Sequence, residues 1–107
     1  MRNNIIISKM LKYIEKILGY CTNITYNEFS ENSILTEACV FNLSQLGELA
    51  TKLDDDFTQQ YANIPWHQMR GLRNKIVHDY EGVNLLLVWE IISDDLPVLK
   101  EKLENIK

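Results

Sequence analysis

The residue types best suited to chemistry gather in one segment, 70–80, which holds two of the three arginines and one of the two histidines. Arg73 carries a planar guanidinium that stays charged at physiological pH and suits phosphate. His78 carries the side chain whose proton moves most easily near neutral pH. Together they can stabilise a charged phosphorane and transfer protons, as RNA cleavage by its own 2′-hydroxyl requires. That reaction needs neither a metal ion nor a protein nucleophile, so we expect no cofactor.

The apolar residues of this segment predict the helix that positions these groups. At 100° per residue the face interpreted as buried comprises Met69, Leu72, Ile76 and Tyr80. The cationic and hydrogen-bonding flank beside it comprises Arg73, Arg70, Asn74 and His78. In a straight helix Arg73 and His78 lie about 140° apart and about 7.5 Å along the axis. They converge on one phosphate only if the helix distorts near His78 or a second copy of the chain completes the site.

A structural interpretation of the same residues stands beside the chemical one. Cationic side chains near the C-terminal end of a helix interact favourably with its macrodipole. Arg73 and His78 fit that description as well, so the spacing alone does not decide between the two.

Length and charge limit the range of functions. At 107 residues the chain is expected to form one domain, 1–107, with a modest core. The net charge of −4 argues against indiscriminate binding to nucleic acid, which rests on a basic surface. Any RNA contact must therefore be local. Arg70, Arg73 and Lys75 form the densest basic cluster outside the first helix, and dimerisation would double it.

Cys21 and Cys39 lack the spacing of a metal site, and we interpret them as isolated small hydrophobic residues. Two such thiols fit a reducing cytoplasm better than a disulfide framework. The apolar run at 5–7 is too short for a signal peptide, and no run approaches the length of a membrane span. We therefore expect a cytoplasmic protein that makes no membrane contact.

Apolar periodicity predicts four long helices joined by short connections. Their expected ranges are 5 to about 23, 32–53, 65 to about 78, and 84–106. Thr25 and Glu28 have the spacing of a capping box and predict a short helical turn. Pro97 predicts a kink or a restart in the last helix, with Asp95 among the possible caps. The expected fold is all-α, an up-down four-helix bundle with short extra helical turns.

Three features within these helices carry specific expectations. Asn42 lies close to a buried face, where its amide is either a bridge to neighbouring backbone or a wall of the site. Gly47 in mid-helix predicts close approach of another helix, either the motif helix or a second subunit. The aspartates at 54–56 point in different directions around a helical turn, so we interpret Asp54 or Asp55 as a helix cap and expect no metal site.

The run Arg73 to Tyr80 resembles the signature of HEPN-domain ribonucleases, an arginine and a polar residue followed by a histidine after four intervening positions. The tyrosine two residues beyond the histidine is similar to that of HepT-like toxins. The resemblance extends over 1–106. The other similar segments are Ile64-Pro65-Trp66, Asn42-Leu43, Gly47-Glu48, Val88 to Ile92 and Asp95 to Pro97.

The resemblance implies a metal-independent endoribonuclease toxin that acts on tRNA or mRNA as a homodimer. Arg73 and His78 would be catalytic, and Asn74, Arg70 and Lys75 would support RNA binding. Some aromatic residues are expected at the dimer interface. Those available are Phe57, Tyr61, Trp66, Tyr80 and Trp89.

A partner also follows from the resemblance, a cognate MNT-type nucleotidyltransferase that serves as antitoxin. It would add AMP to Tyr80 and block the phosphate site, although Tyr80 is also a plausible core-edge residue. Two departures from the family pattern are Lys9, where an acidic residue is frequent, and Phe41, where an arginine is frequent. The alternative function is a non-catalytic substrate-binding or regulatory subunit of a nucleotidyltransferase complex, with Arg73 and His78 structural.

Overall fold

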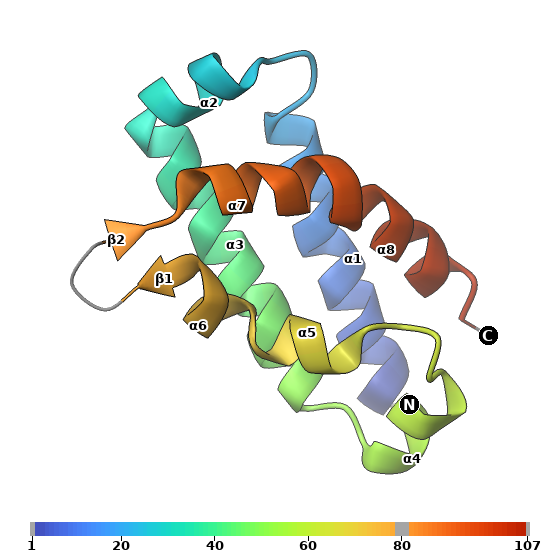
Figure 1. The fold of residues 1–107 in the computed structure, drawn as a ribbon. Coiled ribbons are helices and arrows are strands. Elements are labelled where there is room, and N and C mark those ends of the chain that lie inside the picture. The colour runs from blue at the N-terminus through green and yellow to red at the C-terminus, as the bar shows by residue number, and fades with distance from the viewer. Residues whose placement is uncertain (1, 79–81, 107) are drawn as a thin grey trace.

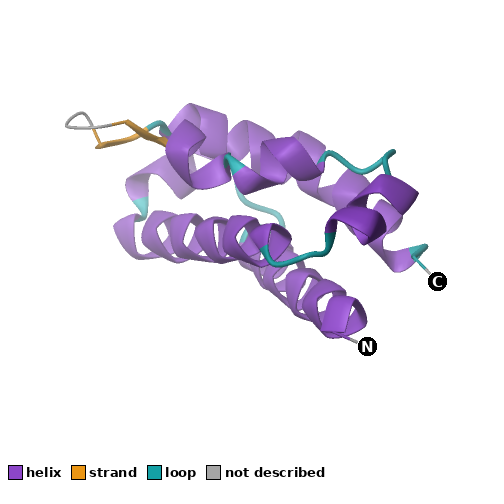
Figure 2. Cartoon of the chain, turned by 90° about the horizontal axis from the view of Figure 1, so that it is seen from below, coloured by secondary structure: helices purple, strands orange, loops and turns teal. Residues whose placement is uncertain are grey.

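The computed structural model describes residues 2–78 and 82–106, and at residues 77 and 78 it describes the backbone alone. Two long helices, α1 (Arg2–Tyr20) and α3 (Ser33–Thr51), pack side by side. The C-terminal helices cross over this pair, and a short β-hairpin projects from one end of the helical body (Figures 1 and 2). Both termini lie toward the opposite end.

The first half of the chain follows its apolar periodicity. The buried residues of α1 are Ile6, Ile7, Met10, Ile14 and Ile17. They pack against a buried stripe of α3 that includes Cys39, Leu43, Leu46 and Ala50. Asn32 begins α3 as its N-cap, because its Oδ1 accepts a hydrogen bond from the Leu35 amide at 3.0 Å. Both predicted helices are confirmed.

The predicted capping box opens α2 (Tyr26–Glu31). The Thr25 hydroxyl oxygen accepts from the Glu28 amide at 3.2 Å, and the Glu28 carboxylate accepts from the Thr25 amide at 2.8 Å. Two otherwise unpaired N–H groups are thereby satisfied. This cap holds Phe29 in the core, where its side chain is fully buried.

Asp54 precedes α4 (Asp55–Gln60) at the predicted cap position, but its carboxylate makes no capping hydrogen bond. The carboxylate instead accepts from the side chains of Arg2 at 3.4 Å and Asn3 at 3.2 Å. Asp54 therefore lies at the predicted cap position, but its carboxylate does not make the predicted capping hydrogen bond. These exposed contacts connect the start of α1 to the α3–α4 connection.

The C-terminal segment consists of α7 (Leu85–Glu90), the π-helix η1 (Ile91–Asp95) and α8 (Leu96–Glu104). Pro97 lies in the first turn of α8, directly after the π-helical segment, so the helix is irregular beside Pro97 but does not stop and restart there. Asp95 precedes α8 without a side-chain capping bond. Because proline has no N–H, it cannot continue the regular ladder from the preceding turn. Leu86 is one of the apolar residues whose spacing predicts a buried face over 84–106, but its side chain is 54% exposed.

The buried side chains form one hydrophobic cluster that includes residues of α1, α3, the segment 64–76 and the C-terminal helices. The all-α class is confirmed, with the small hairpin as an addition. Across the described ranges, no helix combines the length and apolar character that crossing a bilayer requires.

Candidate active site

The motif segment does not form the single helix expected from 65 to about 78. It forms α5 (Trp66–Arg70), a break at Gly71, and α6 (Leu72–Ile76). Pro65 is the N-cap of α5, one residue before the predicted position. The helix ends at Ile76, so the helical wheel that aligned Asn74 with His78 does not apply beyond that residue.

The chain leaves α6 by entering a hairpin of β1 (Val77–His78) and β2 (Gly82–Val83). The strands are antiparallel, with Val77 opposite Val83 and His78 opposite Gly82. The Asn84 amide donates to the Ile76 carbonyl at 3.0 Å, so a bond across the hairpin replaces the next helical one. Gly82 adopts φ +84°, a left-handed conformation that favours glycine.

α5 is seated closely on α3 through Gly47. A Cβ atom at position 47 would lie 2.7 Å from the Met69 carbonyl oxygen, too close for any side chain. The predicted close approach is therefore confirmed, and the approaching element is the motif segment. Arg70 provides a second contact between α5 and α3, because its Nε donates a hydrogen bond to the Ala50 carbonyl oxygen at 3.2 Å.

Arg73 and Asn74 are exposed on α6. Leu72 and Ile76 of the same helix are buried, so the core fixes which side of α6 faces solvent. Within the part of the chain that the structure describes, the Arg73 side chain has no hydrogen-bond or ion-pair partner.

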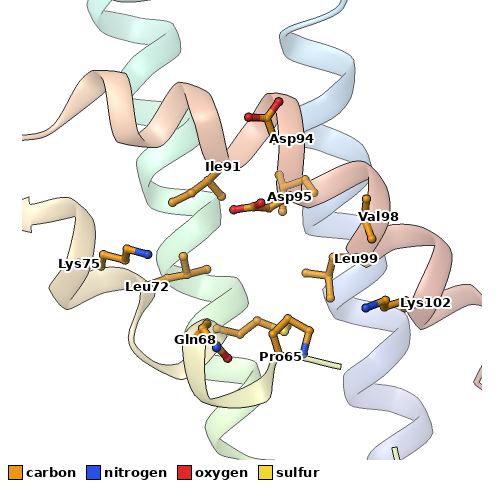
Figure 3. Close-up of a pocket in the computed structure, with 12 residues that line it drawn as sticks. Pro65, Gln68, Leu72, Lys75, Ile91, Asp94, Asp95, Val98, Leu99 and Lys102 are labelled. Atoms are coloured by element: carbon orange, nitrogen blue, oxygen red, sulfur yellow. The ribbon is translucent and has the colours of Figure 1, made fainter. Parts of the chain in front are cut away.

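Lys75 lies on another side of α6, at the edge of a cavity of about 320 Å³ (Figure 3). Apolar residues from α5, α6, η1 and α8 line most of it. Lys75 and Lys102 extend toward the cavity from opposite sides, and Asp94 and Asp95 lie along its upper edge in the view. The two carboxylates offset the positive charge of the lysines at this cavity, in contrast to the surroundings of Arg73.

Two predicted site residues follow α6 in the sequence. His78 belongs to β1 by its backbone, five residues after Arg73 and outside the helix that carries Arg73. Tyr80 lies outside the described residues, so neither its predicted place on the buried face nor its predicted modification is tested. The other histidine, His67, is exposed in α5.

Asn42 is buried and its Nδ2 donates to the Ala38 carbonyl oxygen at 2.7 Å. The amide therefore bonds to the backbone of its own helix, and this bond is not the predicted bridge to a neighbouring backbone. Among the described residues, no group of three His, Cys, Asp or Glu side chains could hold a metal ion.

One feature beside the hairpin was not predicted. Phe41 is 59% exposed on α3 and, with Val83 of β2, lines a hollow of about 240 Å³. The other lining residues are Thr36, Glu37, Val40 and Leu85. Phe41 is one of the apolar residues whose spacing predicts the helix over 32–53, and that spacing favours a buried side chain. Its departure from the family's usual arginine was the available signal that this position faces outward.

Comparisons with known proteins agree with the motif. Residues 10–106 match the family described as Ribonuclease HepT-like. A candidate RNase of Methanocaldococcus jannaschii is 33% identical over 97 residues, covering 91% of this chain and 89% of that protein. A candidate RNase of Caldanaerobacter subterraneus subsp. tengcongensis is 32% identical over 101 residues, covering 88% and 90%.

A candidate ribonuclease HepT of Thermococcus cleftensis is 30% identical over 94 residues, covering 88% of this chain and 86% of that protein. No solved structure matches the chain at a significant level. The family match runs from within α1 to the end of α8 and includes the segment that carries Arg73 and His78.

Proposed function

Because the chain belongs to the HepT-like ribonuclease family, we propose that it is a metal-independent endoribonuclease toxin of a HEPN/MNT toxin–antitoxin system. It cleaves tRNA or mRNA at a site shared by two copies of the chain. Arg73 and His78 are the catalytic residues. The end of α6 at Ile76 is the observation on which the proposal mainly rests.

A continuous helix would hold Arg73 and His78 about 140° apart around its axis. That separation was the main physical objection to a shared phosphate. The helix ends between the two residues and the chain continues into β1. The backbone therefore no longer imposes the separation of about 140°. A distortion near His78, one of the two conditions under which the residues could converge on one phosphate, is therefore present in the backbone.

The proposed reaction uses the substrate's own nucleophile. One histidine takes the proton of the 2′-hydroxyl, whose oxygen attacks the adjacent phosphorus. The bond from phosphorus to the 5′-oxygen breaks, and a second histidine donates a proton to that oxygen. The products are a 2′,3′-cyclic phosphate and a free 5′-hydroxyl. Arg73 stabilises the negative charge of the phosphorane, where a fixed cation is most effective.

The second histidine comes from a second copy of the chain. The exposed surface beside the hairpin supports this assignment, because Phe41, Val83 and Leu86 are all more than one third exposed. Two hydrophobic residues from different elements share one hollow there, next to β2. Large exposed apolar side chains of this kind favour a protein interface. Among the aromatic residues expected to supply it, Trp66 is buried and packs against Phe57, whereas Tyr80 lies outside the described residues.

The supporting residues divide by their surroundings. Asn74, exposed next to Arg73, is placed to hydrogen-bond a phosphate oxygen. Arg70 is half-buried and tied to α3, so its main contribution is to the position of α5. Lys75 shares its cavity with two carboxylates, so we assign it a weaker RNA contact than that of Arg73.

The proposed partner is a nucleotidyltransferase of the MNT type, which silences the toxin by adding AMP to Tyr80. Tyr80 follows His78 by two residues in the sequence. An anionic adduct this close to the motif would compete with RNA phosphate for Arg73. Incubation with the transferase and ATP should therefore add the mass of AMP to the wild-type protein and not to Tyr80→Phe. Unchanged mass of the wild type would refute the modification.

The central test is a cleavage assay on a panel of cellular RNAs in EDTA. Wild type should cleave at least one RNA. His78→Ala should lower the rate by about 100-fold to 10,000-fold, the usual contribution of a general acid or base. Arg73→Ala should cause a loss of similar size, because the phosphorane charge loses its fixed partner.

His67→Ala is the matched control, since His67 is the other histidine and is exposed on α5. It should leave the rate unchanged. Circular dichroism of each variant separates lost chemistry from lost folding. Equal cleavage by wild type and His78→Ala would remove the assignment, and the absence of cleavage by folded wild type would favour a non-catalytic subunit.

A further inference from the structure

Two cysteines that are distant in the sequence meet at one end of the α1–α3 pair. Cys21 follows the last residue of α1, Cys39 lies on α3, and their Sγ atoms are 3.7 Å apart. Both are free thiols. We expected two isolated thiols because the cysteines are far apart in the sequence. That expectation is wrong, since the fold brings the two sulfur atoms into contact.

The surroundings of the two thiols differ. Cys39 has no solvent exposure, whereas Cys21 is half-buried and lies in the turn after α1. The hydrogen bond from the Cys39 thiol lowers the pKa of Cys21. The same bond and burial raise the pKa of Cys39. Cys21 is thus the thiol that ionises first and that a small solute can reach.

We propose that Cys21 and Cys39 form an oxidation site that a hydroperoxide converts into an intrachain disulfide. The Cys21 thiolate attacks one peroxide oxygen, the O–O bond breaks, and one water leaves after taking a proton. The resulting sulfenic acid is attacked by the Cys39 sulfur, the S–O bond breaks, and a second water carries away the Cys39 proton. Two thiols are oxidised and one hydrogen peroxide is reduced to two waters.

The geometry allows this step with a small movement. A disulfide requires a separation of about 2 Å, so the sulfur atoms must approach by less than 2 Å from their present 3.7 Å. Cys21 lies outside the regular helix, so the turn after α1 can absorb that shift. The new bond would close a loop that contains α2, whose Phe29 ring lies 5.1 Å from the Trp89 ring of α7.

The proposal does not depend on ribonuclease activity, and its test measures the thiols alone. Reduced full-length protein is treated with one equivalent of hydrogen peroxide, denatured, and alkylated with iodoacetamide. The expected product is a monomer that is lighter by two hydrogen atoms and has no alkylated cysteine. After digestion, a disulfide should join the peptides that contain positions 21 and 39. Dithiothreitol should restore two alkylation sites. The native oxidised protein should melt roughly 10 °C higher, because the closed loop restricts the unfolded chain.

Two variants assign the order of attack. Cys39→Ala should stop at the Cys21 sulfenic acid, which dimedone captures as an adduct. Cys21→Ser should react with peroxide about tenfold more slowly than Cys39→Ala, since its remaining thiol is buried and its thiolate is disfavoured. Both variants are compared only after circular dichroism shows native helicity, and alanine at position 39 avoids burying a new hydroxyl.

Three results would overturn the proposal. They are full alkylation of both cysteines after peroxide treatment, a disulfide between chains in place of one within the chain, and equal peroxide reactivity of the two single variants. Wild-type measurements alone decide the first two, so the proposal stays testable even if neither variant folds.

Discussion

The motif-bearing segment is held very differently at its two ends. At the α5 end, backbone packs directly against α3 at Gly47, and Arg70 reaches the Ala50 carbonyl. At the hairpin end, two residue pairs join β1 to β2, and Val83 remains exposed. The core therefore determines the position of one end, whereas the other has few contacts within the described chain.

Arg73 and His78 fall on opposite sides of this boundary. Arg73 is on α6, whose buried Leu72 and Ile76 anchor it to the core. His78 belongs to the hairpin. The core therefore fixes the helix that carries the guanidinium, whereas the backbone of His78 is held by its pairing with β2. The following predictions test whether a second copy of the chain contributes to the site at this end.

The largest effect should come from the exposed side of the hairpin. Phe41→Asp places a charge on the surface that we assign to the second copy, so the protein should become monomeric in light scattering. RNA cleavage should fall by about 100-fold or more, because a site with one histidine lacks either its acid or its base. Global stability should change little, since Phe41 is 59% exposed.

Ile5→Asp is the matched control, because Ile5 is 55% exposed and lies on α1. It introduces the same charge and should preserve both the dimer and the cleavage rate. A monomeric Phe41→Asp that cleaves RNA at the wild-type rate would show that the hairpin is positioned without a partner.

The next effect tests the packed end. Gly47→Ala should lower the free energy of unfolding by about 1–3 kcal/mol, because the new methyl group meets the rigid Met69 carbonyl and the helices must separate. Urea denaturation measures the loss. Gly19→Ala on α1 has nothing within 4 Å of its added Cβ and should gain up to about 1 kcal/mol. Similar stability of the two variants would contradict the close helix contact.

The smallest effect on stability should come from the hairpin turn. Gly82→Ala forces a left-handed φ of +84° on a residue with a side chain, a local cost of about 1 kcal/mol. Because the hairpin can open without unfolding the core, cleavage should fall more clearly than global stability. Gly82→Asn should retain more activity, since asparagine tolerates this conformation better. A loss of stability as large as that of Gly47→Ala would show that the hairpin is integrated into the core.

Local signals predicted the parts of the fold that depend on neighbours in the sequence. The capping box at Thr25, the cap position at Asp54 and the helical irregularity beside Pro97 were all found from short-range signals. Gly47 was informative for a similar reason, because a glycine inside an otherwise regular helix needs an explanation. In this case the explanation is a neighbouring backbone.

The end of α6 could not be found in the same way. Ile76 and Tyr80 continue a helical pattern, and the competing hairpin depends on pairing with Gly82 and Val83 farther along the chain. The exposed Phe41 and the Cys21–Cys39 contact were missed because both depend on how α1 and α3 are rotated against their neighbours. Residue type alone predicted the wrong environment for Phe41.

The contact at Gly47 also determines how force would pass through the molecule. Side chains between two helices can change rotamer and absorb a displacement, whereas a backbone seated directly on a backbone cannot. α3 and α5 should therefore move as one stiff unit. A neighbouring subunit that binds α3 near Phe41 would therefore also orient α5 and the α6 helix that follows it. The exposed arginine of α6 would then point in the same direction in every molecule.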